Sequence, residues 1–210
     1  RSVKGVRIGI DEAYCADGVD PELRDSVIAS VAVFQKLGAE VKRITVPPVD
    51  DFIANFSDLV AVEAAAAHAD ALLPHKDKLG PVYREVLERG STLSGRHYAA
   101  LRNSGLAFGG RLRALFDDID VLLCPSWPTA AVEITADALG DLEDQGGLLR
   151  FTGPYNLTGN PTLSIPSGFN GAGMPLGLQL IGRHLEEELL CRVGHAYQQG
   201  TDWHKRFPPV

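Results

Sequence analysis

The clearest pattern in the chain is an apolar repeat of three to four residues that begins after Asp20. Residues at this spacing share one face of an α-helix. The apolar positions are Leu23, Val27, Val31, Phe34 and Leu37. Asp20 is typical of a helix N-cap, Pro21 of the first helical position, and Gly38 of the residue that follows a helix. The sequence therefore predicts a helix that begins after Asp20 and ends before Gly38.

Short apolar runs lie on both sides of this helix. Val6–Ile10 precedes it and Glu40–Val46 follows it, and both have the length and composition of strands. Pro47 and Pro48 stop the second run. The order predicts a β-α-β unit, with a right-handed crossover if the strands are parallel.

The rest of the chain predicts alternating helices and strands, with more turns after Pro125. Helices are expected over Asp51–Leu73, Pro81–Arg89 (ended by Gly90), a long segment capped by Ser94, and Glu186–Gln199 (ended by Gly200). Strands are expected over Asp120–Cys124, Thr162–Ile165 and Leu176–Ile181, and an exposed loop over Thr135–Arg150. We therefore predict the α/β class, with a mixed sheet flanked by helices.

Composition narrows the classes of protein that fit. The chain has 210 residues, of which 45% are hydrophobic and 22% are charged, and this favours one domain over residues 1–210. Its net charge of -7 argues against a broad nucleic-acid surface. No apolar run approaches the length of about 18 residues that a membrane span needs. Three scattered cysteines suit buried thiols in a reducing cytosol, so we expect a cytoplasmic protein.

A search for catalytic groups finds no self-sufficient active site. The G-x-S-x-G motif of α/β hydrolases is absent, and the six histidines show no metal-binding spacing. Cys124 ends a predicted strand, and we favour a buried small residue there over a nucleophile that works with a nearby histidine. Asp117, Asp118 and Asp120 are interpreted as solvated turn residues rather than paired acids. We therefore expect no catalytic residue, metal or cofactor in this chain.

The stretch Phe151–Gly168, FTGPYNLTGNPTLSIPSG, concentrates three glycines and three prolines around one short strand. A segment this constrained either shapes a site or forms a crowded turn. It also carries a resemblance. With the downstream GMPLGLQLIG, the helix that follows and the final WH, it resembles the carboxyl-terminal segment of the amidase signature family. DVLLCPSWPTAAVEI, residues 120–134, and the opening β-α-β unit are similar to that family as well.

The resemblance implies an amide hydrolase whose catalytic part lies elsewhere. Members of that family use a lysine, a serine in a cis peptide and a nucleophilic serine, all in a Gly/Ser-rich region, and no such run occurs here. Because the chain opens on Arg1 and enters a strand almost at once, we expect it to be the carboxyl-terminal portion of such an enzyme, inactive alone. The expected partner of the whole enzyme is a small-molecule amide. The alternative is a non-catalytic α/β ligand-binding or regulatory module derived from an amidase.

Five residues are candidate substrate contacts in the wall of the pocket. Ser126, Trp127 and Thr129 follow a strand at its carboxyl end, where α/β proteins often bind ligands, although Trp127 could equally anchor the loop. Thr152 and Asn156 are polar positions in the Gly/Pro-rich stretch, and Asn156 could instead bond its own backbone in a turn.

Truncation of a large sheet has a physical consequence for assembly. An incomplete sheet leaves an unpaired edge and an uncovered apolar face. We therefore expect the chain to form a symmetric homodimer that covers this face.

Overall fold

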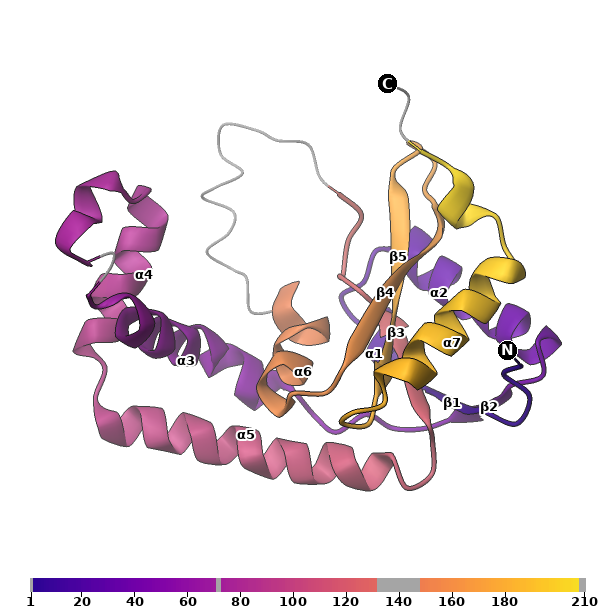
Figure 1. Cartoon of the computed structure of the whole chain (residues 1–210), viewed down its shortest axis with the longest axis horizontal. Helices are drawn as coiled ribbons and strands as arrows, with labels where there is room; N and C mark the ends of the chain where they lie inside the picture. The colour runs from indigo at the N-terminus through magenta and orange to yellow at the C-terminus, as the bar shows by residue number, and fades with distance from the viewer. Residues whose placement is uncertain (1, 71–72, 132–147, 208–210) are drawn as a thin grey trace.

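The computed structural model describes residues 2–70, 73–131 and 148–207, with side chains omitted for 50–55 and 73. Its centre is a five-stranded sheet in the order β2-β1-β3-β5-β4 (Figure 1). The strands are β1 (Arg7–Ile10), β2 (Glu40–Arg43), β3 (Val121–Pro125), β4 (Thr162–Phe169) and β5 (Pro175–Gly182). β1 is parallel to β2 and β3, whereas β5 is antiparallel to both β3 and β4. The predicted α/β class and mixed sheet are confirmed.

The helices are α1 (Glu12–Ala16), α2 (Pro21–Lys36), α3 (Asp50–His68), α4 (Pro81–Thr92), α5 (Gly95–Leu115), α6 (Gly153–Thr158) and α7 (Glu187–Gln199). Short 3-10 turns are η1 (Leu73–Lys78), η3 (Leu148–Phe151) and η4 (Trp203–Lys205). Among the described residues, no helix combines the length and apolarity needed to cross a bilayer.

Two helices cover one face of the sheet. On α2, the predicted apolar positions lie in the core or pack against it. The ring of Phe34 on α2 lies 5.0 Å from that of Tyr197 on α7, centroid to centroid. The Ser26 hydroxyl of α2 donates to that of Ser167 on β4 at 2.6 Å. η3 and α6 lie on the other face. There the side chain of Gln179 on β5 donates a hydrogen bond to the Phe151 carbonyl of η3. Between these layers every residue of β3 is buried.

The local signals for helix ends are confirmed. The Asp20 carboxylate accepts the backbone N–H of Glu22, and Gly38 follows α2 with a φ of 94°. Ser94 caps α5 by accepting the N–H of His97. Gly200 stands at the C-cap of α7. These predictions succeed because a cap depends on residues one or two turns away.

Several predicted boundaries are wrong. Gly90 does not end α4, which continues to Thr92, because Gly90 is buried where α4 crosses α3. The stretch after Phe151 was expected to form only turns and a strand, but it opens with helix α6. The predicted loop Thr135–Arg150 lies outside the described residues up to 147, and its last residues belong to η3.

Helices α3, α4 and α5 extend to one side of the sheet in Figure 1. The exposed positions of β4, Thr162 and Ser164, are polar, so this strand does not present the uncovered apolar face that we expected. Four large exposed apolar side chains lie on the three extending helices, at Val60, Val82, Tyr83 and Leu106, and four others, Trp127, Met174, Leu185 and Phe207, lie elsewhere among the described residues.

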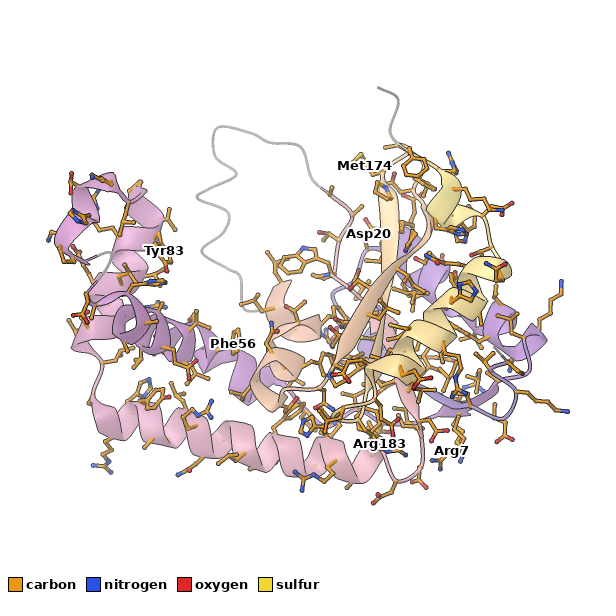
Figure 2. The ribbon with its side chains drawn as sticks, viewed as in Figure 1. Arg7, Asp20, Phe56, Tyr83, Met174 and Arg183 are labelled. Carbon is orange, nitrogen blue, oxygen red and sulfur yellow. The ribbon has the colours of Figure 1, made fainter. Side chains whose placement is uncertain are left out.

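An ion-pair network joins three strand ends at the base of the sheet, where Figure 2 shows Arg7 and Arg183 on neighbouring segments. The Arg7 guanidinium donates to Asp120 at 2.7 and 3.2 Å, and the Arg7 backbone N–H donates to it at 2.9 Å. Arg183 pairs with Asp120 at 3.4 Å and donates to the carbonyls of Phe116 and Ile119. Asp120 is therefore a structural residue, and its interpretation as a solvated turn residue is wrong.

Candidate functional site

The candidate site lies at the carboxyl ends of the parallel strands β1 and β3. β1 is followed directly by Asp11, whose carboxylate accepts the N–H groups of Ala13 and Tyr14 and so begins α1. The other carboxylate oxygen accepts the N–H of Val46 at 2.8 Å. One aspartate thus fixes α1, with Tyr14 and Cys15, over the end of the sheet.

The loop after β3 is held by backbone hydrogen bonds at both sides. The N–H of Ser126 donates to the Gly177 carbonyl of β5 at 3.1 Å, and the N–H of Asp20 donates to the Pro128 carbonyl at 2.8 Å. A Cβ on Gly177 would lie 2.5 Å from the Ser126 hydroxyl, so the glycine lets this serine lie against β5. Trp127 is 37% exposed, and Thr129 is half-buried. The loop is a rigid rim with an accessible aromatic ring.

Gln179 connects this rim to the Gly/Pro-rich stretch. Its amide nitrogen donates to the Phe151 carbonyl at 2.7 Å and lies 3.6 Å from the Cys124 sulfur. The Gln179 side chain is buried, and a buried amide needs a hydrogen-bond partner. The bond to Phe151 therefore holds η3 and the start of α6 beside the end of β3. Sequence reasoning missed Gln179, although a polar residue inside an apolar strand was a usable signal.

Thr152 and Asn156 are placed by α6. Thr152 is the N-cap and makes no side-chain capping bond, and Asn156 is exposed on the helix. The turn interpretation of Asn156 is wrong, because Pro154 near the start and left-handed Gly159 (φ 72°) at the end define a short helix. The Gln179–Phe151 hydrogen bond holds Thr152, at the start of α6, beside the end of β3, and no hydrogen bond joins the five predicted side chains among the described residues.

A cluster of buried polar side chains lies beneath this rim. The Tyr14 hydroxyl donates to the Arg150 carbonyl at 2.6 Å. The Tyr155 side chain is buried in the same cluster, and burial raises the pKa of its hydroxyl well above the usual range. The Arg150 guanidinium lies 4.9 Å from the centre of the Tyr14 ring and donates to the Asp17 carbonyl at 2.5 Å. These contacts lock η3 onto α1, and neither tyrosine nor Arg150 was selected from the sequence.

Two thiols lie in this cluster, Cys15 and Cys124, and both are buried. Burial raises the pKa of Cys124 to about 12, against the weaker opposing effect of the hydrogen bond from Gln179. Burial also raises the pKa of Cys15 well above its usual range. A thiolate is the reactive form of cysteine, and at neutral pH both groups stay protonated. The interpretation of Cys124 as a buried small residue is confirmed, and the raised pKa of its thiol weighs against the hypothesis of a hydrolase built on it.

Two cavities lie away from the five predicted residues. One of about 550 Å³ lies between α5, α6 and the turn after β5, and one of about 790 Å³ lies between α2, β4 and η4. The described residues that line them include none of the five. Within the described ranges, no group of three or more His, Cys, Asp or Glu side chains could hold a metal ion. The described residues of the site form a wall that backbone hydrogen bonds tie to β5 and α2.

Comparisons with known proteins agree on one family. The family model described as Amidase matches residues 1–191. The protein named putative amidase AmiD of Mycobacterium tuberculosis (strain ATCC 25618 / H37Rv) is 43% identical over 152 residues, which cover 71% of this chain and 32% of AmiD. A component of the glutamyl-tRNA(Gln) amidotransferase of Microcystis aeruginosa (strain NIES-843 / IAM M-2473) is 34% identical over 234 residues, which cover 99% of this chain and 47% of that relative.

Solved structures show the same fold. A bacterial aryl acylamidase of the amidase signature enzymes superposes with a TM-score of 0.80 at 20% identity, over 97% of this chain and 45% of that one. A 6-aminohexanoate cyclic dimer hydrolase, in complex with substrate, also gives 0.80 at 22% identity, over 99% and 48%. The chain thus spans less than half the length of these relatives.

Proposed function

The chain belongs to the amidase family, and from that membership we propose that it forms the carboxyl-terminal part of an enzyme that hydrolyses a carboxylic amide to an acid plus ammonia or an amine. The observation that carries the proposal is the family match over residues 1–191, in relatives about twice as long. The substrate of the whole enzyme is a small-molecule amide.

The proposed chemistry uses the serine-serine-lysine set that the family resemblance implies, on a segment outside these 210 residues. The serine hydroxyl attacks the amide carbonyl, and its proton passes through the second serine and the lysine to the departing amine. Water then hydrolyses the acyl-serine ester and releases the acid. The buried, protonated state of Cys15 and Cys124 supports a nucleophile from elsewhere.

In this proposal the described chain supplies one wall of the substrate pocket. Ser126, Trp127 and Thr129 would contact the substrate from the rim after β3, Thr152 from the N-cap of α6, and Asn156 from the helix itself. The support is structural: the rim is bonded to β5 and α2, and Gln179 ties the start of α6 to the same end of the sheet. Rigid walls of this kind orient a substrate with little loss of conformational entropy.

We expect no turnover of a simple aromatic amide by residues 1–210 alone, because the proposed catalytic serines and lysine lie outside them. The measurement is an amidase assay on the repurified chain, together with the DNA sequence that precedes the Arg1 codon in the same reading frame. That frame is expected to encode a lysine and a Gly/Ser-rich run, and the longer protein is the positive control. Activity that survives repurification and a Cys124→Ala change would contradict the proposal.

The second candidate is a non-catalytic α/β ligand-binding or regulatory module derived from an amidase. It is supported by the five-stranded sheet, which packs around a core of buried residues from this chain. A start codon next to Arg1, with an inactive protein, would favour this candidate over the enzyme.

We also propose that the chain is cytoplasmic and forms a symmetric homodimer. The three free cysteines support the first part, and the exposed apolar residues on α3 and α4 support the second. We expect light scattering to give the mass of two chains at high protein concentration, because association would bury Val60, Val82 and Tyr83. A replacement of Val82 with aspartate should shift the mass toward one chain. A wild-type monomer at every concentration would rule the dimer out.

A further inference from the structure

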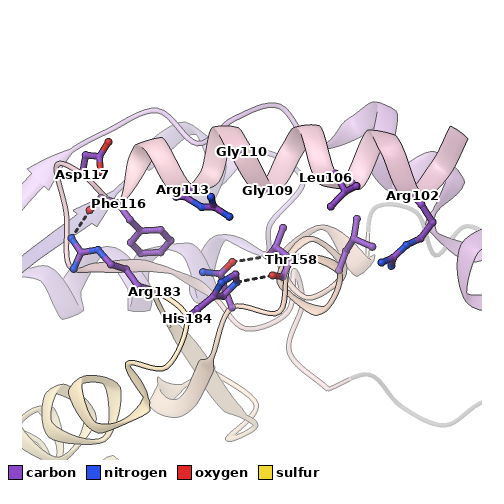
Figure 3. Close-up of a pocket in the computed structure, with 13 residues that line it drawn as sticks. Arg102, Leu106, Gly109, Gly110, Arg113, Phe116, Asp117, Thr158, Arg183 and His184 are labelled. Atoms are coloured by element: carbon purple, nitrogen blue, oxygen red, sulfur yellow. Dashed lines mark hydrogen bonds between the residues drawn. The ribbon is translucent and has the colours of Figure 1, made fainter. Parts of the chain in front are cut away.

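The cavity of about 550 Å³ between α5, α6 and the turn after β5 has no role in the proposed amide chemistry (Figure 3). Its volume falls in the range of small-molecule sites, about 300–1,000 Å³. It opens beside the base of the sheet, and its residues come from segments that the ion-pair network of Arg183 holds in place.

Glycines on α5 create the cavity. A Cβ on Gly105 would lie 2.0 Å from the Leu157 side chain, so this glycine lets α6 pack directly on α5. One turn later the α5 surface is bare. A Cβ on Gly110 would meet no described atom within 4 Å, and one on Gly109 would meet only the Thr158 methyl group, at 3.5 Å. The close contact fixes the walls, and the two following glycines leave the space between them empty.

The lining is basic although the chain as a whole is acidic. Among the described lining side chains, four can carry positive charge and only Asp117 can carry negative charge, in a protein of net charge -7. The four are Arg102, Arg113, Arg183 and His184. Such a local excess of one sign favours a ligand of the opposite sign.

Arg113 differs from the other arginines of the lining, because its guanidinium is not paired with a described residue. Arg183 is occupied by Asp120 and two backbone carbonyls, and Arg102 lies 3.6 Å from Glu63. The Arg113 side chain is exposed and has no hydrogen bond or ion pair with any described residue. Figure 3 shows its guanidinium reaching from α5 into the cavity, on the side of His184. Its planar fork can hold a carboxylate or phosphate through two parallel hydrogen bonds.

The remaining lining is apolar or already bonded. The Nε2–H of His184 donates to the Thr158 carbonyl at 2.7 Å, because a carbonyl oxygen can only accept. The Asn160 amide nitrogen donates to the Gly182 carbonyl. Leu106 and Leu157 supply apolar surface beside the arginine. The described lining therefore offers the Arg113 guanidinium to a ligand, next to an apolar wall.

We propose that this cavity binds a small amphipathic organic anion, with its carboxylate or phosphate on Arg113 and its apolar body along Leu106 and Leu157. The site is separate from the predicted substrate wall, and its occupant does not depend on the amidase chemistry.

The test is a calorimetric titration of the 210-residue protein with benzoate, with phenyl phosphate and with neutral benzyl alcohol. We expect at least one anion to bind about tenfold or more tightly than the alcohol, because the charged hydrogen bonds to arginine are lost with the neutral probe. The ratio of the two anion affinities distinguishes a carboxylate site from a phosphate site. If neither anion binds, or if benzyl alcohol binds as tightly, the proposal fails.

Matched variants locate the binding. Arg113→Gln is expected to weaken the anion about tenfold or more. Arg111→Gln is the control, because this arginine is exposed on the same helix, stacks over Phe108 and does not line the cavity. Gly110→Leu should also abolish binding, because its side chain would enter the open space. A folded Gly110→Leu protein, or an Arg113→Gln protein, with unchanged affinity would overturn the assignment.

Discussion

Replacing Gly90 with alanine is expected to destabilise the protein by about 2–3 kcal/mol, the upper part of the range for overpacked sites. A Cβ on Gly90 would lie 1.9 Å from the Ala61 carbonyl oxygen and 2.9 Å from the Val62 nitrogen. Both contacts are with the backbone of α3, which cannot rotate away as a side chain could. α3 and α4 must therefore separate, which disturbs the packing of Ala61 and Leu87, both fully buried.

The measurement is the urea denaturation midpoint of Gly90→Ala, with Gly110→Ala as the matched control. Gly110 is also inside a helix, but its Cβ would meet no described atom within 4 Å. Alanine there should stabilise the protein by up to about 1 kcal/mol through helix propensity. A loss of stability for Gly90→Ala together with a gain for Gly110→Ala would show that the close crossing of α3 and α4 causes the destabilisation. A Gly90→Ala protein as stable as wild type would mean that the two helices do not cross this closely.

Asp120→Asn is expected to lower the free energy of unfolding by about 2 kcal/mol at neutral pH. Asp120 receives hydrogen bonds from the Arg7 side chain and backbone and pairs with Arg183. The variant keeps the shape but loses the charge that both arginines face. Partial exposure screens the interaction, so the effect stays below that of a fully buried pair. Asp118→Asn is the control, because Asp118 is exposed and its backbone carbonyl, rather than its carboxylate, accepts from Lys42.

The same residue predicts a pH dependence with a definite sign. Hydrogen bonds from the Arg7 side chain, more than any other factor, lower the pKa of Asp120 to about 2. In the unfolded chain an aspartate has a pKa of about 3.9. The folded state therefore favours the ionised carboxylate, and this stabilisation is complete above about pH 4 and is lost as the pH falls toward 2. The difference between wild type and Asp120→Asn should be smaller near pH 3 than at neutral pH. A difference that does not change with pH would place the carboxylate outside the network.

The candidate site was only partly predictable. The rim after β3 was predicted because Pro125 at the end of an apolar strand indicates that a loop begins there. The structure places Ser126 and Trp127 in that loop, at the carboxyl end of β3. Helix α6 was missed because glycine and proline usually interrupt a helix, although here Pro154 lies in the first turn of the helix and Gly159 closes it. Gln179 and Tyr155 were missed because their significance comes from burial beside Cys124, which no local pattern encodes.

By itself the sequence determined the features that depend on neighbours along the chain. The ends of α2, the cap of α5 and the end of α7 follow from Asp20, Ser94 and Gly200, because each cap bonds a backbone group within a turn or two. The class of fold follows from the same local periods, and the family from the residues of the Gly/Pro-rich stretch.

Only the tertiary structure decided the features whose partners are distant in the chain. Arg7 meets Asp120 across 113 residues, and Gly90 meets Ala61 where two helices cross. The basic cavity likewise exists only because α5, α6 and the turn after β5 converge around Gly110 and Arg113. Such contacts depend on how the sheet and helices pack in three dimensions, and a glycine or an arginine has the same local signature whether or not a distant partner faces it.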